Sequence, residues 1–231
     1  MERRDFVTFC VASAATAAAP AVAADSQPRL YTRTRLVDAK GAPLLAKAVP
    51  RERNLIFHYP YEATPCFLLN LGRPAAAAAH LQTADKRPYA WHGGVGAQRS
   101  IVAYSAICAH RLTYPTKDIS FISYRAEKSA RNKFGSVIHC CSEHSQYDPA
   151  EGARVVAGPA PQPLAAILLE WDAATDGLHA VGTLGGEMFN EFFDKFGFKL
   201  QMEHGNTARN AASAACVVQP LEDYCKQQVK C

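Results

Sequence analysis

Two short segments of this 231-residue chain each carry one cysteine and one histidine. They read Cys108-Ala-His110 and Cys141-Ser-Glu-His144, and residues 111–140 lie between them. Thiolates and imidazoles are both metal ligands. One metal centre can use all four side chains only if the fold brings the two segments face to face, so this pattern constrains the fold more than any other feature. Structural zinc sites are the alternative, although their ligands more often come as Cys pairs and His pairs at short spacing.

Predicted strands lead into both segments. Residues 100–107 are apolar and β-branched, which predicts a buried strand that ends directly at Cys108. Residues 136–140 form a second apolar run that ends directly before Cys141. We therefore expect both Cys/His pairs to lie on loops at the ends of strands.

Short strands are predicted along most of the chain. Residues 54–59 and 66–71 are bounded by prolines and by Gly72, and residues 164–171 and 178–181 form a closing hairpin. The alanine run at 75–79 is expected to be a loop or a short helical turn. Many short strands separated by Gly and Pro clusters are typical of a mostly antiparallel β domain.

One helix is predicted late in the chain, over residues 186–197. Its apolar residues occupy one face, and Gly197 is a natural stop. We expect that face to pack on the β core. The apolar positions are 188, 189, 192, 193 and 196.

The first 24 residues have the features of an export signal. Arg3 and Arg4 precede an uncharged, alanine-rich stretch from Phe6 to Ala24, and Ala21-Val22-Ala23 fits a small-x-small cleavage pattern. Paired arginines before a weakly apolar run resemble a twin-arginine signal, which predicts a periplasmic protein. The alternatives are an ordinary export signal and a retained membrane anchor.

Composition excludes several classes of protein. Apolar residues make up 48% and charged residues 20%, which excludes a disordered or collagen-like chain. The net charge of +4 is spread along the sequence without a basic run, so we expect no nucleic-acid partner. The 111–140 segment holds six basic residues against Asp118 and Glu127, which suggests either a solvated loop or a docking surface for an acidic partner.

The C-x-H and C-x-x-H pairs resemble the Rieske iron–sulfur family. Residues 145–149, Gly152 and residues 158–161 resemble the family's second cluster loop and its Pro-rich loop, so the resemblance covers about residues 98–170. Looser similarity in segments 58–60, 65–69 and 93–96 is greatest to the small Rieske subunit of arsenite oxidase and its periplasmic relatives. The resemblance implies a Rieske-type β sandwich with an inserted cluster-binding subdomain.

The resemblance also implies the cofactor and its ligands. One [2Fe-2S] cluster would take Cys108 and Cys141 on the inner iron and His110 and His144 on the outer iron, while other side chains donate hydrogen bonds to cluster sulfur. Those donors are Ser145 and Tyr147. Replacing two thiolates by histidines makes the centre less negative, which raises its potential from about −400 mV to roughly −150 to +300 mV.

The chain departs from the family in two places: two cysteines are absent, and the segment between the motifs, residues 111–140, is long. The extra cysteines that clamp the two loops in many members are replaced by Thr113 and Glu143. The spacing also leaves the second loop with two registers, because Ser145 and Tyr147 align without a gap only if the ligand is Cys140. We prefer Cys141 with His144, which preserves the Cys/His chemistry and shortens one turn by a residue.

The remaining cysteines are expected to form disulfides in part, because the predicted compartment is oxidising. We expect Cys216 to pair with Cys225 or Cys231 and Cys140 to be a small buried residue, while Cys66 is unassigned. The predicted organisation is a signal at 1–24, a lead-in segment at 25–53, the Rieske domain at 54–184, and a helix with a cysteine-containing tail at 185–231.

Three functions remain open on the sequence. The first is one-electron transfer as the small subunit or partner of a periplasmic oxidoreductase, with cytochrome c or a cupredoxin as acceptor. The second is the Rieske subunit of a quinol–cytochrome c reductase, and the third is a zinc-stabilised binding domain. A Rieske oxygenase is disfavoured, because no chain remains after the cluster domain for a catalytic iron domain.

Overall fold

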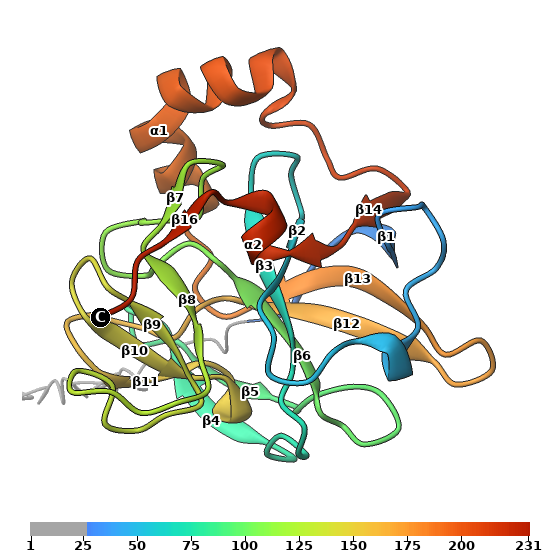
Figure 1. The fold of residues 1–231 in the computed structure, drawn as a ribbon, viewed down its shortest axis with the longest axis horizontal. Coiled ribbons are helices and arrows are strands. Elements are labelled where there is room, and N and C mark those ends of the chain that lie inside the picture. The colour runs from blue at the N-terminus through green and yellow to red at the C-terminus, as the bar shows by residue number, and fades with distance from the viewer. Residues whose placement is uncertain (1–26) are drawn as a thin grey trace, which may run out of the picture.

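The computed structural model describes residues 27–231. Its largest element is an eight-stranded sheet in the order β14-β1-β13-β12-β6-β3-β2-β15, antiparallel except where β14 meets β1 (Figure 1). The strands of this sheet are β1 (Arg29–Val37), β2 (Leu55–His58), β3 (Pro65–Asn70), β6 (Ile101–Ser105), β12 (Ala166–Asp172), β13 (Gly177–Leu184), β14 (Ala215–Val217) and β15 (Gln219–Pro220).

A second, smaller sheet carries the order β11-β10-β9-β8 and holds the loops of interest. Two further pairs, β4 with β5 and β7 with β16, complete the strands of the described residues. These strands are β4 (Ala79–Gln82), β5 (Pro88–Trp91), β7 (Ile119–Ser120), β8 (Ile122–Arg125), β9 (Val137–Cys140), β10 (Ser145–Asp148), β11 (Arg154–Ala157) and β16 (Gln227–Gln228).

Each face of the large sheet packs in its own core, and alternate side chains along a strand enter different cores. On β3, Phe67 and Leu69 face a core shared with β9 and β10, whereas Cys66 and Leu68 face a second core with β1 and β13. The small sheet is thereby packed against the large one. The predicted mostly β class, its smaller inserted sheet and its C-terminal helix are confirmed.

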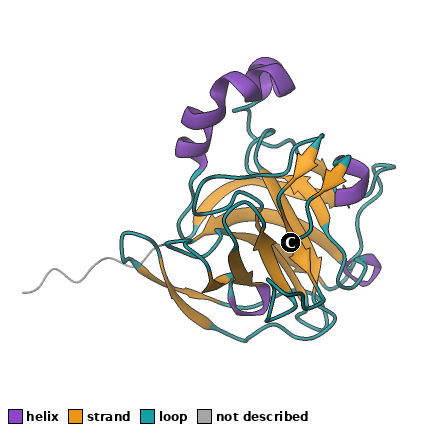
Figure 2. Cartoon of the chain, turned by 60° about the vertical axis from the view of Figure 1, so that its left-hand side comes forward, coloured by secondary structure: helices purple, strands orange, loops and turns teal. Residues whose placement is uncertain are grey.

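Five helices, most of them a single turn, lie between the strands of residues 27–231. They are η1 (Ala46–Ala48), η2 (Pro149–Glu151), α1 (Phe189–His204), η3 (Gly205–Thr207) and α2 (Leu221–Tyr224). Figure 2 shows α1 standing apart from the sheets at one end of the molecule. The alanine run at 75–79 is a loop that leads into β4.

Helix α1 differs from the prediction in its length and its partner. It continues past Gly197 to His204, because Leu200 adds another buried contact on the same face. Phe189, Phe192 and Phe193 pack mainly on Ile107 and on the loop that follows Cys108, so the helix supports that loop rather than the sheet centre.

The segments predicted to lie before and after the Rieske domain, residues 25–53 and 185–231, contribute strands to its sheets. Residues 25–53, predicted as a lead-in, contain β1, which pairs with β13 and β14. The polar tail also joins the sheets: β15 pairs with β2, and β16 pairs with β7. The signal that the sequence offered in β1 is weak: Arg33 and Arg35 alternate with the fully buried Thr34 and Leu36.

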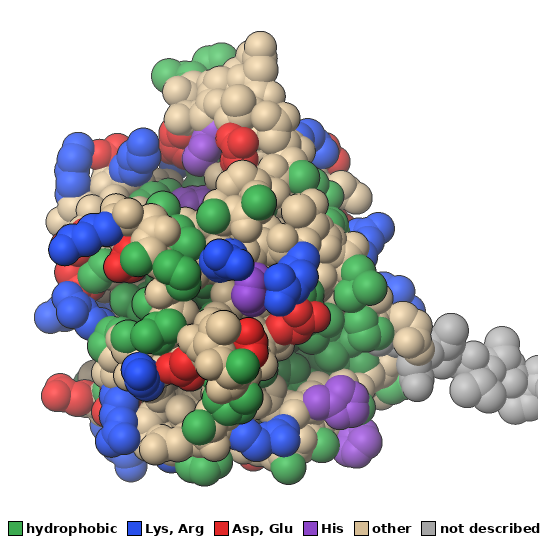
Figure 3. All heavy atoms as spheres, turned by 90° about the vertical axis from the view of Figure 1, so that its right-hand side faces the viewer, with side chains coloured by type: hydrophobic (Ala, Val, Ile, Leu, Met, Phe, Trp, Pro, Cys, Tyr) green, Lys and Arg blue, Asp and Glu red, His purple; other side chains and the backbone are tan. Residues whose placement is uncertain are grey.

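The export signal and the anchor alternative fall on residues outside the described part of the chain. Within residues 27–231 no helix combines the length and the apolar character that a membrane span requires. On the face shown in Figure 3, basic and acidic side chains are interspersed with apolar ones and do not gather by sign.

Candidate metal centre

The two cysteines that meet at the centre of the site are Cys108 and Cys140. Cys108 follows β6 and Cys140 ends β9, and each is only 1% exposed. The two thiols interact: Cys140 lowers the pKa of Cys108 below that of an ordinary thiol, with burial opposing it, and Cys108 raises the pKa of Cys140, with burial acting in the same direction. Two buried thiols in contact form one half of a mixed Cys/His donor set.

Strand alternation explains why Cys140 has this position. In the β9–β10 hairpin Cys140 lies opposite Ser145, and Ile138 lies opposite Tyr147. All four side chains are buried, and residues opposite one another in a hairpin share a face. His139 and Cys141, one residue out of step, therefore point the other way.

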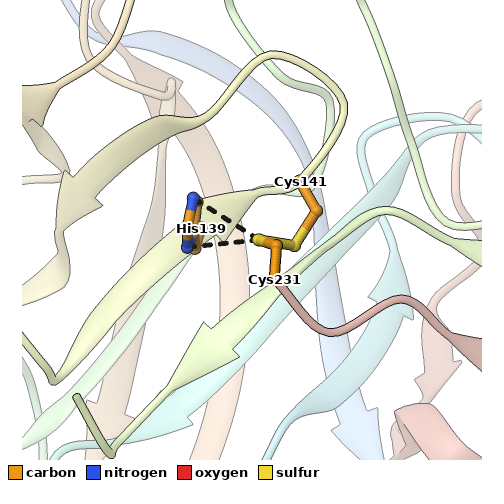
Figure 4. A group of neighbouring side chains, drawn as sticks. All are labelled: His139, Cys141 and Cys231. Carbon is orange, nitrogen blue, oxygen red and sulfur yellow. Dashed lines mark hydrogen bonds between the residues drawn. A yellow bond between two sulfur atoms is a disulfide. The ribbon is translucent and has the colours of Figure 1, made fainter. Parts of the chain in front are cut away.

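The prediction of Cys141 as a ligand is wrong in this structure. Its sulfur is bonded to that of Cys231, at a Cα–Cα distance of 5.7 Å, and a disulfide sulfur is not a thiolate. His139 lies beside this bond, with its Nδ1 3.5 Å from Cys231 Sγ (Figure 4). His139, Cys141 and Cys231 are close enough together for a metal ion, but the disulfide removes both sulfur ligands.

The predicted disulfide partners of the tail are also wrong. Cys231 pairs with Cys141, whereas the Cys216 thiol donates to the His58 carbonyl at 3.1 Å. The Cys225 thiol is buried and donates to the Gln227 carbonyl at 3.0 Å. The sequence did contain a signal that one of these cysteines faces away from the site. Cys140 and Cys141 are adjacent, and neighbouring side chains at the end of a strand point to opposite sides.

His110 and His144 lie on the two loops, as predicted, and both side chains are half-buried. The Nδ1 atom of each ring is shielded from solvent and has no hydrogen-bond partner. His144 adopts a left-handed backbone with φ of 60°, at the end of the four-residue loop that connects β9 to β10. A non-glycine residue in that conformation costs about 1 kcal/mol, which functional loops commonly tolerate.

Tyr147 and Ser145 supply hydroxyls to the same centre. The Tyr147 hydroxyl lies 3.2 Å from Cys108 Sγ and accepts the Ala109 N–H at 3.2 Å. Ser145 Oγ is fully buried and has no partner. A buried hydroxyl or ring nitrogen without a partner costs about 1–3 kcal/mol, so three of them in two facing loops indicate a place built for a bound group.

A third loop closes over the second. Gly158 has a φ of 86°, and a Cβ at this position would lie 2.5 Å from His144 O and from Ser145 Cα. Only glycine permits such a close approach of two backbones. Gly158 therefore packs directly on the backbone of His144 and Ser145.

Charged side chains surround the two loops. Arg131 Nη1 lies 3.0 Å from His144 Nε2, and the Gln146 side-chain amide donates to the Arg131 carbonyl at 2.7 Å. Arg111 and Glu143 form an exposed ion pair at 3.6 Å between the loop tips. Glu143 is thus directed to solvent, and an exposed pair of this kind contributes at most about 1 kcal/mol.

The donor set fits an asymmetric two-iron cluster. Two buried thiols and two Nδ1 atoms without partners match two thiolates and two neutral imidazoles, and the hydroxyls of Ser145 and Tyr147 are donors for sulfur. The residues that would hold the group are Cys108, His110, Cys140 and His144.

Comparison with protein-family models finds no match. Among solved structures, the chain is similar to the soluble domain of the Rieske protein II (soxF) from Sulfolobus acidocaldarius. The sequences are 24% identical, the TM-score is 0.46, and the match covers 68% of this chain and 82% of that chain. At this level the similarity says nothing of what the present chain binds.

Proposed function

We propose that the protein transfers single electrons through a Rieske-type [2Fe-2S] cluster held by Cys108, His110, Cys140 and His144. The observation that carries the proposal is the set of buried polar atoms without partners. Nδ1 of His110, Nδ1 of His144 and Ser145 Oγ all lie on the loops that bring the two thiols together.

When bound, such a cluster supplies a centre that accepts and donates one electron at roughly −150 to +300 mV. The chain's own residues set the environment of that centre. Cys108 and Cys140 are shielded from water, whereas His110 and His144 are only half-buried. The two histidines therefore form the side from which a partner protein would exchange the electron.

Two hydroxyls tune the site. Tyr147 donates to Cys108 Sγ, because burial raises the pKa of Tyr147 and keeps its hydroxyl protonated. Ser145 Oγ is free to donate to sulfur in the loaded protein. A donor to sulfur stabilises the reduced, more negative state and raises the potential.

Loaded protein tests the proposal. Protein purified from an iron-replete host should contain two irons and two acid-labile sulfides per chain, which is the stoichiometry of the proposed cluster, and give the low-average-g EPR signal of a mixed His/Cys cluster after reduction. His144→Ala and Cys140→Ser should abolish the signal, while Glu143→Gln should retain it. A colourless preparation with one zinc per chain would establish the zinc-stabilised domain instead.

We further propose that the protein is the electron-transfer subunit or partner of a larger periplasmic oxidoreductase, similar to arsenite oxidase. The resemblance in residues 58–96 and the twin-arginine pattern at Arg3 and Arg4 support this context. An affinity tag on the chain in its native host should recover a large catalytic subunit, or a c-type cytochrome or cupredoxin as acceptor. Recovery of a cytochrome b would favour the quinol–cytochrome c reductase.

A further inference from the structure

Either of two adjacent cysteines, Cys140 or Cys141, could supply the second thiolate of the proposed cluster. Cys140 and Cys141 both precede His144, and the spacing from Cys141 to His144 is the C-x-x-H pattern that the sequence favoured. A thiol at either position can reach a metal centre if the four-residue loop changes its local conformation. Loops tolerate such changes at little cost, so the strand alone does not exclude Cys141.

The disulfide removes this choice. Cys141 Sγ is bonded to Cys231, the last residue of the chain, on the opposite side of β9 from Cys108. Oxidised sulfur offers no thiolate. Cys140 is then the thiol of the second loop that remains available beside Cys108.

The tail that carries Cys231 is held in place before it reaches the loop. The Gln227 N–H donates to the Asp118 carbonyl at 3.1 Å, and the Val229 N–H donates to the Ser120 carbonyl at 2.8 Å. The Arg125 guanidinium donates to the Val229 carbonyl. Ser129 Oγ donates to the Cys231 carbonyl at 3.0 Å, so the tail is fixed beside β8 and the end of β9 (Figure 1).

We propose that the Cys141–Cys231 disulfide selects the cluster ligand: by withholding the Cys141 thiol, the anchored C-terminal tail leaves Cys140 as the only cysteine of the second loop that can ligate. The inference rests on the proposed cluster. It assigns Cys231 as a positioning residue that acts through Cys141.

Two matched variants isolate this role. Cys231→Ser and Cys141→Ser both break the disulfide and free the tail, but only Cys231→Ser leaves a thiol at position 141. Cys216→Ser, in the same C-terminal region but in contact with His58, is the control for loss of a cysteine. The readouts on loaded protein are the EPR spectrum, iron per chain, the reduction potential, and alkylation of Cys140 measured by mass spectrometry.

Cys231→Ser should give a second EPR species and make Cys140 accessible to alkylation in a fraction of the molecules. Cys141→Ser should give one species, and its Cys140 should stay as protected as in the wild type. The proposal is overturned if the two variants behave alike, whether both resemble the wild type, both become heterogeneous or both fail to fold. Failure of the proposed function is distinct, because the wild-type protein itself would then lack iron and the EPR signal.

Discussion

The hydroxyl of Tyr147 and the sulfur of Cys108 lie 3.2 Å apart, although 38 residues separate them in the chain. The Tyr147 oxygen also accepts the Ala109 N–H, and its hydroxyl can donate to the sulfur when Cys108 is a thiolate. One side chain of β10 thus contacts both the backbone and the sulfur of the first loop. This contact joins β10 to that loop on the buried side of the site.

Tyr147→Phe removes the donor and should lower the reduction potential. If the lost bond favours the reduced state by about 1 kcal/mol, the decrease is about 40 mV for a one-electron centre. A redox titration followed by visible absorption measures it. Tyr104→Phe is the matched control, because that buried hydroxyl donates to the Pro149 carbonyl at 2.7 Å and not to sulfur. An equal decrease in both variants would refute the assignment.

Ser145→Ala should have opposite consequences in the metal-free and loaded proteins. Ser145 Oγ has no partner in the protein, so its removal should leave the free energy of unfolding of the metal-free form unchanged or higher by up to about 1 kcal/mol. In loaded protein the potential should fall, because a donor to sulfur is lost. Urea unfolding and redox titration measure the two effects. A marked loss of stability in the metal-free form would show that Ser145 has a structural partner.

Phe192→Ala should remove the packing of α1 on the loop after His110, although Phe192 itself is not one of the site residues. Phe192 is fully buried, and its ring centroid lies 4.9 Å from that of Tyr114 in the loop after His110. We expect a loss of about 3–5 kcal/mol in the free energy of unfolding and faster loss of iron to a chelator. Phe198→Ala is the control on the same helix, because Phe198 is 83% exposed and its loss should cost less than about 0.5 kcal/mol.

Acid should destabilise the protein through His58. Burial lowers the pKa of His58 to about 4, with the nearby charges of His204 and Lys117 acting in the same direction. Below about pH 6.5 the His58 side chain is protonated in the unfolded chain, whereas in the native state it is protonated only below about pH 4. The free energy of unfolding should therefore fall with decreasing pH across this window, by at most about 1.4 kcal/mol per pH unit for this group.

Urea unfolding at several pH values checks the effect of His58. His58→Gln should reduce the slope of the pH dependence between about pH 6.5 and 4, where His139 also contributes. Substitution of the exposed His80 by Gln should preserve the wild-type slope. A His58→Gln variant with the wild-type slope would show that other groups carry the acid sensitivity.

Local patterns predicted much of the architecture. The strands around 55–58, 65–70, 101–105 and 137–140, and the hairpin of β12 and β13, follow from alternation and from Gly and Pro breaks, which act within a few residues. The same local chemistry placed His110 and His144 on the two loops, and Ser145 and Tyr147 lie on β10 directly after the second loop. Their types and spacings are properties of the sequence itself.

Tertiary structure alone decided which cysteine faces Cys108. Cys140 and Cys141 are the same residue type one position apart, and the side that each faces depends on how β9 pairs with β8 and β10. The partner of Cys141 comes from the far end of the chain, 90 residues away, where no local pattern can indicate it. Strand pairing and the path of the tail are long-range properties, and they decide which of the two cysteines lies beside Cys108, a choice that spacing had left open.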